Sequence, residues 1–288
     1  MDFYLTALLQ GLCFSALALG IFISMKIFNI PDITTDGSYT LGAVVTAVMI
    51  THHQPTYIIL PAVIVAGGLA GALTGIIHTK LKINALLAGI LVMTALYSVN
   101  LTLMGTSNLP LNNFPTIFNL LNISADPNHN TFWIVSIFVI IITILIGYLL
   151  KTDFGIAMRA TGNSESMIRS LGVNTDRMKI TGLALANALT AVSGYLISQN
   201  QGFTDISMGI GIVIVGLGSV IIAETLINWF RITSVWLSLI LVLAGGVIFQ
   251  LVLAVTLEIG VDANLLKLVT AGFVLVIVSL PRINFKRG

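Results

Sequence analysis

The sequence predicts an all-α fold: a polytopic membrane protein with about nine transmembrane helices, in a range of roughly eight to ten. Two features of the composition predict it, since 57% of the 288 residues are hydrophobic and only 8% are charged. Soluble domains carry about 25% charged residues, so this chain is too apolar for that class. The third observation is a series of apolar runs of about 20 residues, the length that crosses a bilayer as a helix.

Eight stretches have the length and composition of a membrane span. A ninth stretch, residues 38–52, is shorter, and Pro31, Gly37 and two aspartates interrupt the apolar pattern just before it. We expect a broken or re-entrant helix here, because irregular backbone at membrane depth must be buried in protein or line a cavity. The whole chain, residues 1–288, is expected to form a single transmembrane domain. The eight clear spans are residues 3–25, 56–78, 84–104, 131–150, 180–199, 207–223, 233–254 and 264–281.

The distribution of Lys and Arg predicts the orientation, because cytoplasmic loops are enriched in these residues. They gather near Lys80, in residues 151–179, at Arg231 and at the C-terminus. Nine spans then place the N-terminus outside and the C-terminus in the cytoplasm. Residues 105–130 become a long extracellular loop, which could be a lid, a surface for a partner or a solvated connection. Lys and Arg are missing from the loops 105–130, 200–206 and 255–263.

Residues 151–179 contain eight of the 24 Lys, Arg, Asp and Glu residues of the chain. Each of these charges would cost about 2.5–3.5 kcal/mol at the centre of a bilayer. The segment is therefore predicted to be a cytoplasmic loop between two spans. Asn163 or Ser164 can cap a short helix that runs to about Ser170, and Gly172 can end it.

This short helix carries an apolar face made by Met167, Ile168 and Leu171. A cytoplasmic amphipathic helix of this kind suits a groove on a partner protein. The alternative is a surface helix that lies on the membrane domain of its own chain. A second helix that begins at Asn174 or Thr175 would lead into the next span.

Polar residues inside two spans are candidates for lining a transport pathway. Thr94, Tyr97 and Ser98 lie on one helical face, and Asn187 and Thr190 share a face of another span. Such residues either face a pathway or form hydrogen bonds between helices, each worth roughly 0.6–2 kcal/mol. The sequence leaves both interpretations open. The candidate pathway-lining residues are Asp36, Thr94, Tyr97, Ser98, Asn187 and Thr190.

Several function classes are disfavoured by missing motifs. The sequence has no G-x-x-x-x-G-K-[ST] pattern, no H-E-x-x-H pattern and a single cysteine, Cys13. We therefore expect no catalytic residues, no metal site and no cofactor bound by this chain. Basic residues lie at span ends and form no patch, so a nucleic-acid partner is not expected. Asp32 and Asp36 are the only acidic candidates for mid-membrane positions, which disfavours an ion-coupled carrier.

The segment FGIAMRATGNSESMIRSLGVNTDRMKITGLALANALTAVSGYL, residues 154–195, resembles the coupling loop of bacterial ABC-importer permeases. These belong to the superfamily of branched-chain amino-acid and ribose permeases. Residues 30–43 and 201–224 are more similar to the subgroup of tryptophan- and tyrosine-type uptake permeases. The matching positions of the loop are Phe154, Gly155, Arg159, Ala160, Gly162, Asn163, Gly172, Val173 and Lys179.

The resemblance implies the membrane subunit of an importer in the bacterial cytoplasmic membrane. Besides the surrounding membrane lipid, it implies three protein partners: a separate ATP-binding subunit that holds the ATP, an extracellular substrate-binding protein, and a second permease copy or a related chain. The expected solute is an amino acid, with an aromatic one as the narrower interpretation. By this resemblance the ATPase-coupling residues are Arg159, Gly162, Asn163, Glu165, Met167, Arg169 and Gly172.

Three other functions stay open at this point. A permease of the same build could carry a nucleoside or a sugar, because these motifs do not specify the solute. A stand-alone secondary carrier or channel would work without an ATPase, but it leaves the charged loop unexplained. An intramembrane enzyme would require a paired catalytic constellation, which the sequence does not contain.

Overall fold

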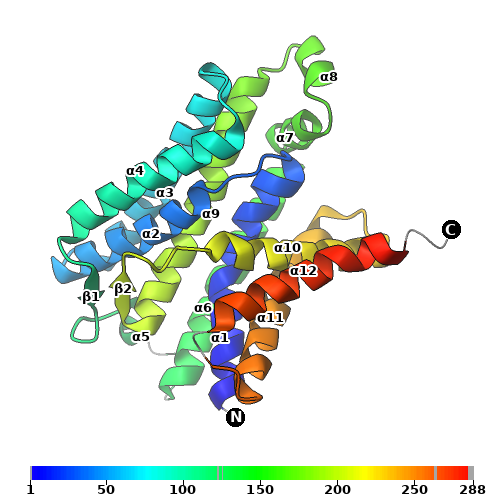
Figure 1. Cartoon of the computed structure of the whole chain (residues 1–288). Helices are drawn as coiled ribbons and strands as arrows, with labels where there is room; N and C mark the ends of the chain where they lie inside the picture. The colour runs from blue at the N-terminus through cyan, green and yellow to red at the C-terminus, as the bar shows by residue number, and fades with distance from the viewer. Residues whose placement is uncertain (1, 122, 125, 263–264, 285–288) are drawn as a thin grey trace.

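The computed structural model describes residues 2–121, 123–124, 126–262 and 265–284. Nearly all of this part of the chain is helical (Figure 1). The long helices are α1 (Asp2–Ile21), continued by the π-helix η1 (Phe22–Ile27), α2 (Thr34–Thr51), α3 (Thr56–Lys80), α4 (Ala85–Met104), α6 (Pro127–Lys151), α9 (Thr175–Gln201), α10 (Ile212–Trp229), α11 (Val235–Glu258) and α12 (Leu266–Asn284). The short elements are β1 (Asn108–Pro110), α5 (Ile117–Leu120), α7 (Asp153–Asn163), α8 (Glu165–Ser170) and β2 (Phe203–Asp205).

The all-α, multi-pass class is confirmed, but the expected count of about nine spans is too high. Seven of the described helices are long and apolar enough to cross a membrane. The two that fall short are α2 and α12. Helix α2 contains five threonines, a serine and Asp36, and most of its side chains are buried inside the protein. Such a helix can lack an apolar surface because it meets little lipid.

Helix α9 lies at the centre of the bundle, with 78% of its span buried. It packs against α3, α2 and α1, while α10, α11 and α12 lie on the far side of α1 (Figure 1). Glycines let the backbones approach closely. A Cβ on Gly42 would lie 2.0 Å from the carbonyl oxygen of Ala191, and one on Gly71 would lie 2.1 Å from that of Leu183.

The expected break near residues 38–52 lies earlier in the chain. Residues 28–33 are irregular, with Asn29 at a φ of 53°. Helix α2 then runs without interruption from Thr34 to Thr51. Asp36 and Gly37, which were expected to interrupt the pattern, lie in the first turn of this helix. The prediction that 38–52 is itself broken is therefore wrong.

A second irregular segment replaces the start of the predicted span 207–223. Helix α10 begins only at Ile212, and residues 206–211 form turns. The chain follows α2 here: the Thr204 hydroxyl donates to the Ala43 carbonyl oxygen, and Gly209 packs on the Asp36 backbone. Seven helical residues separate these two contacts, so the segment descends about 10 Å along α2.

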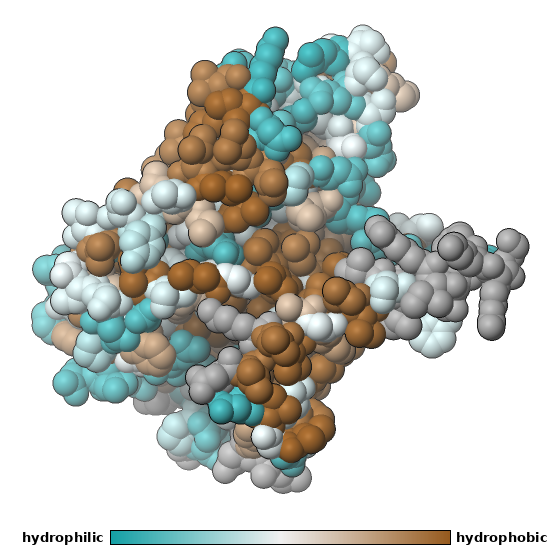
Figure 2. Space-filling view, viewed as in Figure 1, coloured by the Kyte–Doolittle hydropathy of each residue, from teal (hydrophilic) through white to brown (hydrophobic). Residues whose placement is uncertain are grey.

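The two ends of the bundle differ in character. Strands β1 and β2 pair antiparallel, with Leu109 opposite Thr204, at one end, and α7 and α8 lie at the other (Figure 1). Figure 2 shows hydrophobic side chains over the flank of α3 and α4 and hydrophilic side chains around the α7–α8 end. The Lys- and Arg-rich segment 151–179 therefore sits beyond the apolar belt, as expected for a loop outside the bilayer.

Candidate functional site

The short helix predicted in the charged loop is confirmed. Ser164 separates α7 from α8, and α8 ends before Gly172, whose φ of 87° suits glycine. The next helix also starts where the sequence indicated. Asn174 caps α9, because its side-chain oxygen accepts a hydrogen bond from the Arg177 amide at 3.0 Å.

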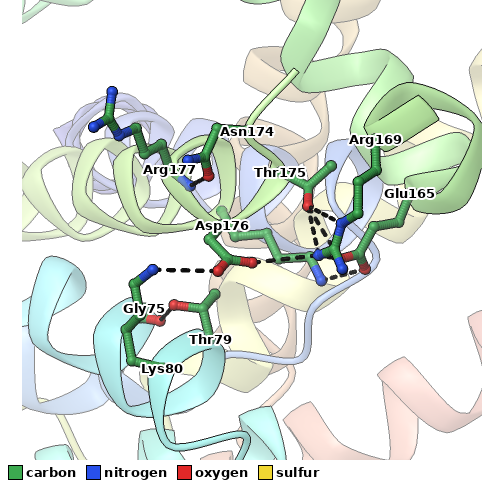
Figure 3. A network of polar contacts seen from close by, with 10 residues as sticks. Gly75, Thr79, Lys80, Glu165, Arg169, Asn174, Thr175, Asp176 and Arg177 are labelled. Atoms are coloured by element: carbon green, nitrogen blue, oxygen red, sulfur yellow. Dashed lines mark hydrogen bonds and ion pairs between the residues drawn. The ribbon is translucent and has the colours of Figure 1, made fainter. Parts of the chain in front are cut away.

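Charged side chains tie α8 to the start of α9 (Figure 3). Arg169 donates to Glu165 at 2.8 Å and to the Thr175 hydroxyl at 2.8 Å. Glu165 also accepts from Lys179, whose side chain is only 17% exposed. The Lys179 ammonium, helped by the Thr175 hydroxyl and by Arg169, holds the pKa of Glu165 below its usual range.

The same network reaches α3. Asp176 accepts from Arg169 at 3.4 Å and from Lys80, at the end of α3, at 3.3 Å (Figure 3). Exposed ion pairs of this kind contribute about 0.2–1 kcal/mol each. Their effect here is geometric, since they fix the position of a six-residue helix that has no buried side chain of its own.

The predicted coupling residues fall into different environments. Glu165 and Arg169 pair with each other in the ion-pair network, so their charged groups are already engaged within the chain. Met167 is 62% exposed and points away from the bundle core. Gly162 is a packing position on α7: a Cβ there would lie 1.6 Å from the carbonyl oxygen of Ile27. The remaining three are Arg159, whose buried Nε has no hydrogen-bond partner in the described part of the chain, the exposed Asn163, and Gly172 at the end of α8.

Sequence reasoning missed the partners of this network. The i, i+4 spacing of Glu165 and Arg169 on a helix was a usable signal for their pairing. Thr175 and Lys179 follow Glu165 by 10 and 14 residues in the same loop. Lys80, by contrast, is 96 residues away from Asp176 in sequence. No local pattern predicts a contact of that separation.

Asp36 caps the start of α10. Its two carboxylate oxygens accept from the Gly211 amide at 2.9 Å and from the Val213 amide at 2.8 Å. Gly211 occupies the N-cap position and has no side chain to do this. A carboxylate at a helix N-terminus also interacts favourably with the helix dipole. Asp36 therefore joins α2 to the irregular segment that leads into α10.

Asn187 and Thr190 are buried and engaged in hydrogen bonds. Asn187 donates to the Asp32 carboxylate at 2.6 Å and accepts from the Ser38 hydroxyl at 2.7 Å. Thr190 donates to the carbonyl oxygen of Ala186 within its own helix. The Asn187 contacts match the alternative in which polar residues bond helices together, whereas the Thr190 bond stays within α9. Asp32 was missed as the partner of Asn187, because 155 residues separate them.

Thr94, Tyr97 and Ser98 lie on the exposed face of α4. Helix α4 packs on α2 and α3, which stand between it and the centre of α9. The six candidate pathway residues therefore do not form one stripe. Asp36 and Tyr97 are the pair that share a small cavity, of about 30 Å³, between α2, α4 and residues 206–211.

The β1–β2 end of the bundle carries a separate polar depression of about 250 Å³. It lies between residues 111–119 and the end of α9, where Gln199 accepts from the Ile117 amide at 2.9 Å. Nearby, the side-chain and backbone donors of Ser207 hold the pKa of Asp205 below its usual range. Residues 108–117 are thus anchored to α9 by Gln199 and to β2 by strand pairing.

Comparisons with known proteins decide the family. The model of the family described as "Branched-chain amino acid transport system / permease component" matches residues 3–279. The chain belongs to this permease family. It is a permease component of the ABC-transporter type and a multi-pass membrane protein.

Individual relatives agree with this assignment. The tyrosine transport system permease protein of Clostridioides difficile is 37% identical over 99% of this permease and 93% of its own length. The ribose import permease protein RbsC of Haemophilus influenzae is 23% identical over 67% of this permease and 60% of its own length. A solved structure described as an inward-facing conformation of a metal-chelate type ABC transporter superposes with a TM-score of 0.52. It covers 97% of this permease and 84% of its own chain at 15% identity, so it supports the fold alone.

Proposed function

We propose that this permease is the membrane subunit of an importer that moves an amino acid, of the aromatic class, by alternating access. The family requires a separate subunit to supply the energy of ATP hydrolysis, and an extracellular protein would deliver the solute. A second copy of the permease, or a related chain, would complete the pore. The solute class rests on the tyrosine transport relative, which matches almost the whole chain.

The observation that carries the coupling role is the exposed helix α8. Its position is fixed by Glu165, Arg169 and Lys179, while Met167 and Leu171 stay 62% and 68% exposed. A rigid helix with an exposed apolar face suits insertion into a groove on another protein. We therefore assign α8 as the contact for the ATP-binding subunit. On this proposal the α7–α8 end lies in the cytoplasm, and we propose the same side for the C-terminus.

The test is a detergent co-purification of the tagged permease from its native host. An ATP-binding subunit should co-purify with the unaltered chain and be lost with Met167→Asp. Phe230→Asp is the matched control, because Phe230 is also 62% exposed but lies on the turn between α10 and α11. Recovery of the same ATP-binding subunit with Met167→Asp would show that α8 is not part of the interface. Transport by the purified chain alone would favour a secondary carrier.

A sugar remains the second candidate solute, because a ribose import permease is among the relatives. Uptake by the purified complex in liposomes separates the two. ATP-dependent accumulation of labelled L-tyrosine, with no accumulation of labelled ribose, is the expected result. The reverse result would replace the amino-acid proposal by a sugar.

A further inference from the structure

A small cavity opens beside Asp36, between α2, α4 and the turns that precede α10. Its volume of about 30 Å³ is enough for one small polar group, such as an ammonium or a hydroxyl. Its polar lining comes from Asp36, Thr40, Tyr97 and Asn100.

Asn100 is the residue in this lining with an unmet hydrogen bond. Its side chain is 1% exposed, and its Oδ1 has no hydrogen-bond partner among the described residues. The amide orientation is fixed by its other end, because Nδ2 donates to the Gly37 carbonyl oxygen at 3.4 Å. Exchanging the two ends would set two acceptors against each other. A buried acceptor without a donor is rare in native proteins, and it marks a place where a donor is expected to bind.

The groups around Asn100 favour a donor that carries positive charge. The Asp36 carboxylate lies in the same lining, and its two oxygens accept from Gly211 and Val213. The Thr40 hydroxyl donates to the Asp36 carbonyl oxygen at 3.1 Å, which leaves its own lone pairs as acceptors. An ammonium offers three donors and no acceptor, so it matches this set.

The cavity is reached from the exposed face of α4. Tyr97 lines it and is 49% exposed. A solute that placed its ammonium beside Asn100 would lay the rest of its structure along this ring. Gly209 also lines the cavity and packs closely on α2, since a Cβ there would lie 2.1 Å from the Asp36 carbonyl oxygen.

We propose that Asn100, with Asp36 beside it, forms the subsite that receives the α-ammonium group of the transported amino acid. The inference rests on the proposed import function and adds the residue that distinguishes an amine-bearing solute from one without an amine. Binding forms one hydrogen bond from the ammonium to Asn100 Oδ1 and involves no covalent step.

A thiol reporter tests the site directly on the assembled complex. The only cysteine of the chain, Cys13, is fully buried, so Met93→Cys supplies the reactive thiol at the cavity wall. The measurement is the rate of maleimide labelling with added L-tyrosine, tyramine or 3-(4-hydroxyphenyl)propionate. The first two carry an amine and should protect the thiol. The third lacks it and should not.

Asn100→Leu in the reporter background should raise the tyrosine concentration for half-protection about tenfold, because a hydrogen bond to a charged group is lost. Asn100→Asp keeps an acceptor but loses the donor to the Gly37 carbonyl oxygen, so it is not a suitable folding control. Size-exclusion profiles and thermal melts of the Asn100→Leu complex that match those of the unaltered complex guard against a folding defect. Thr102→Val is the matched control on the same helix, since its exposed hydroxyl bonds to the Ser98 carbonyl oxygen within its own helix.

Equal protection by all three compounds, or full protection in Asn100→Leu, would overturn the subsite. Labelled tyrosine uptake by the unaltered complex is measured in parallel. If that uptake is absent, the proposed solute class fails. If uptake is normal but protection ignores Asn100, the subsite alone fails.

Discussion

Replacement of Asp36 by asparagine should loosen the first turn of α10. In the native chain both carboxylate oxygens accept backbone amides, from Gly211 at 2.9 Å and from Val213 at 2.8 Å. Asparagine keeps one acceptor but places an NH₂ group where the second oxygen was. One amide of the α10 start then faces another donor instead of an acceptor. Because Asp36 is buried, water cannot compensate freely.

The expected cost follows from the two contacts. A hydrogen bond to a charged group contributes about 1.5–3 kcal/mol, and an unpaired buried donor costs about 1–3 kcal/mol. One bond is lost and the other loses its charge, so the local opening free energy should fall by about 2 kcal/mol. A change of that size speeds the local opening about 30-fold.

Hydrogen exchange measured by mass spectrometry on the detergent-solubilised protein is the appropriate assay. Peptides that contain residues 211–215 should exchange about 30-fold faster in Asp36→Asn, while those from α6 stay unchanged. Asp205→Asn is the matched control, because the described hydrogen bonds of the Asp205 carboxylate go to Ser207 and Asn108 and not to the α10 amides. Unchanged exchange at 211–215 would refute the assignment of Asp36 as the cap of α10.

Three further predictions follow from the packing and the charged loop. Gly42→Ala should destabilise the protein by about 1–3 kcal/mol in a thermal melt, because the new Cβ would meet the Ala191 carbonyl oxygen. Gly68→Ala is the control and should be neutral, because the nearest atom to its new Cβ would be 3.8 Å away. Glu165→Gln should leave global stability within about 1 kcal/mol of the unaltered protein but increase the mobility of a spin label at Met167→Cys. The pKa of Glu165 is depressed, so its contribution is present above its usual value of 4.5 and is lost only as the pH falls through the lower, folded value. The mobility of the same label should therefore increase below pH 4.5 in the native background and show no such step in Glu165→Gln. An increase in mobility near neutral pH in the native background would contradict the network.

The sequence was sufficient where local chemistry decides the structure. Apolar runs set the long helices, and Asn174 and Gly172 marked the ends of helices in the charged loop. Helix α2 was the difficult case, since its Thr, Ser and Asp residues read as an interruption in a membrane-facing pattern. They are instead the pattern of a helix surrounded by protein, and only its neighbours show this.

The candidate site was less predictable, because its contacts join distant parts of the chain. Asp36 and Gly211 are 175 residues apart, and Asp32 and Asn187 are 155 apart. Their residue types indicated that polar partners were needed. They did not indicate which partner, or whether it was a solute or another helix. Asn100 is one of several polar residues in its span, and only its missing partner sets it apart.

The contact of Gly162 with the Ile27 carbonyl oxygen has a mechanical consequence. The Asn29 side chain also donates to the Gly162 carbonyl oxygen at 3.3 Å, so α7 is seated directly on the bend that follows η1. Three residues beyond Asn29, Asp32 holds Asn187 in the middle of the bundle. A displacement of α7 would therefore be transmitted directly to the bend at residues 28–33, and from there to the buried start of α2.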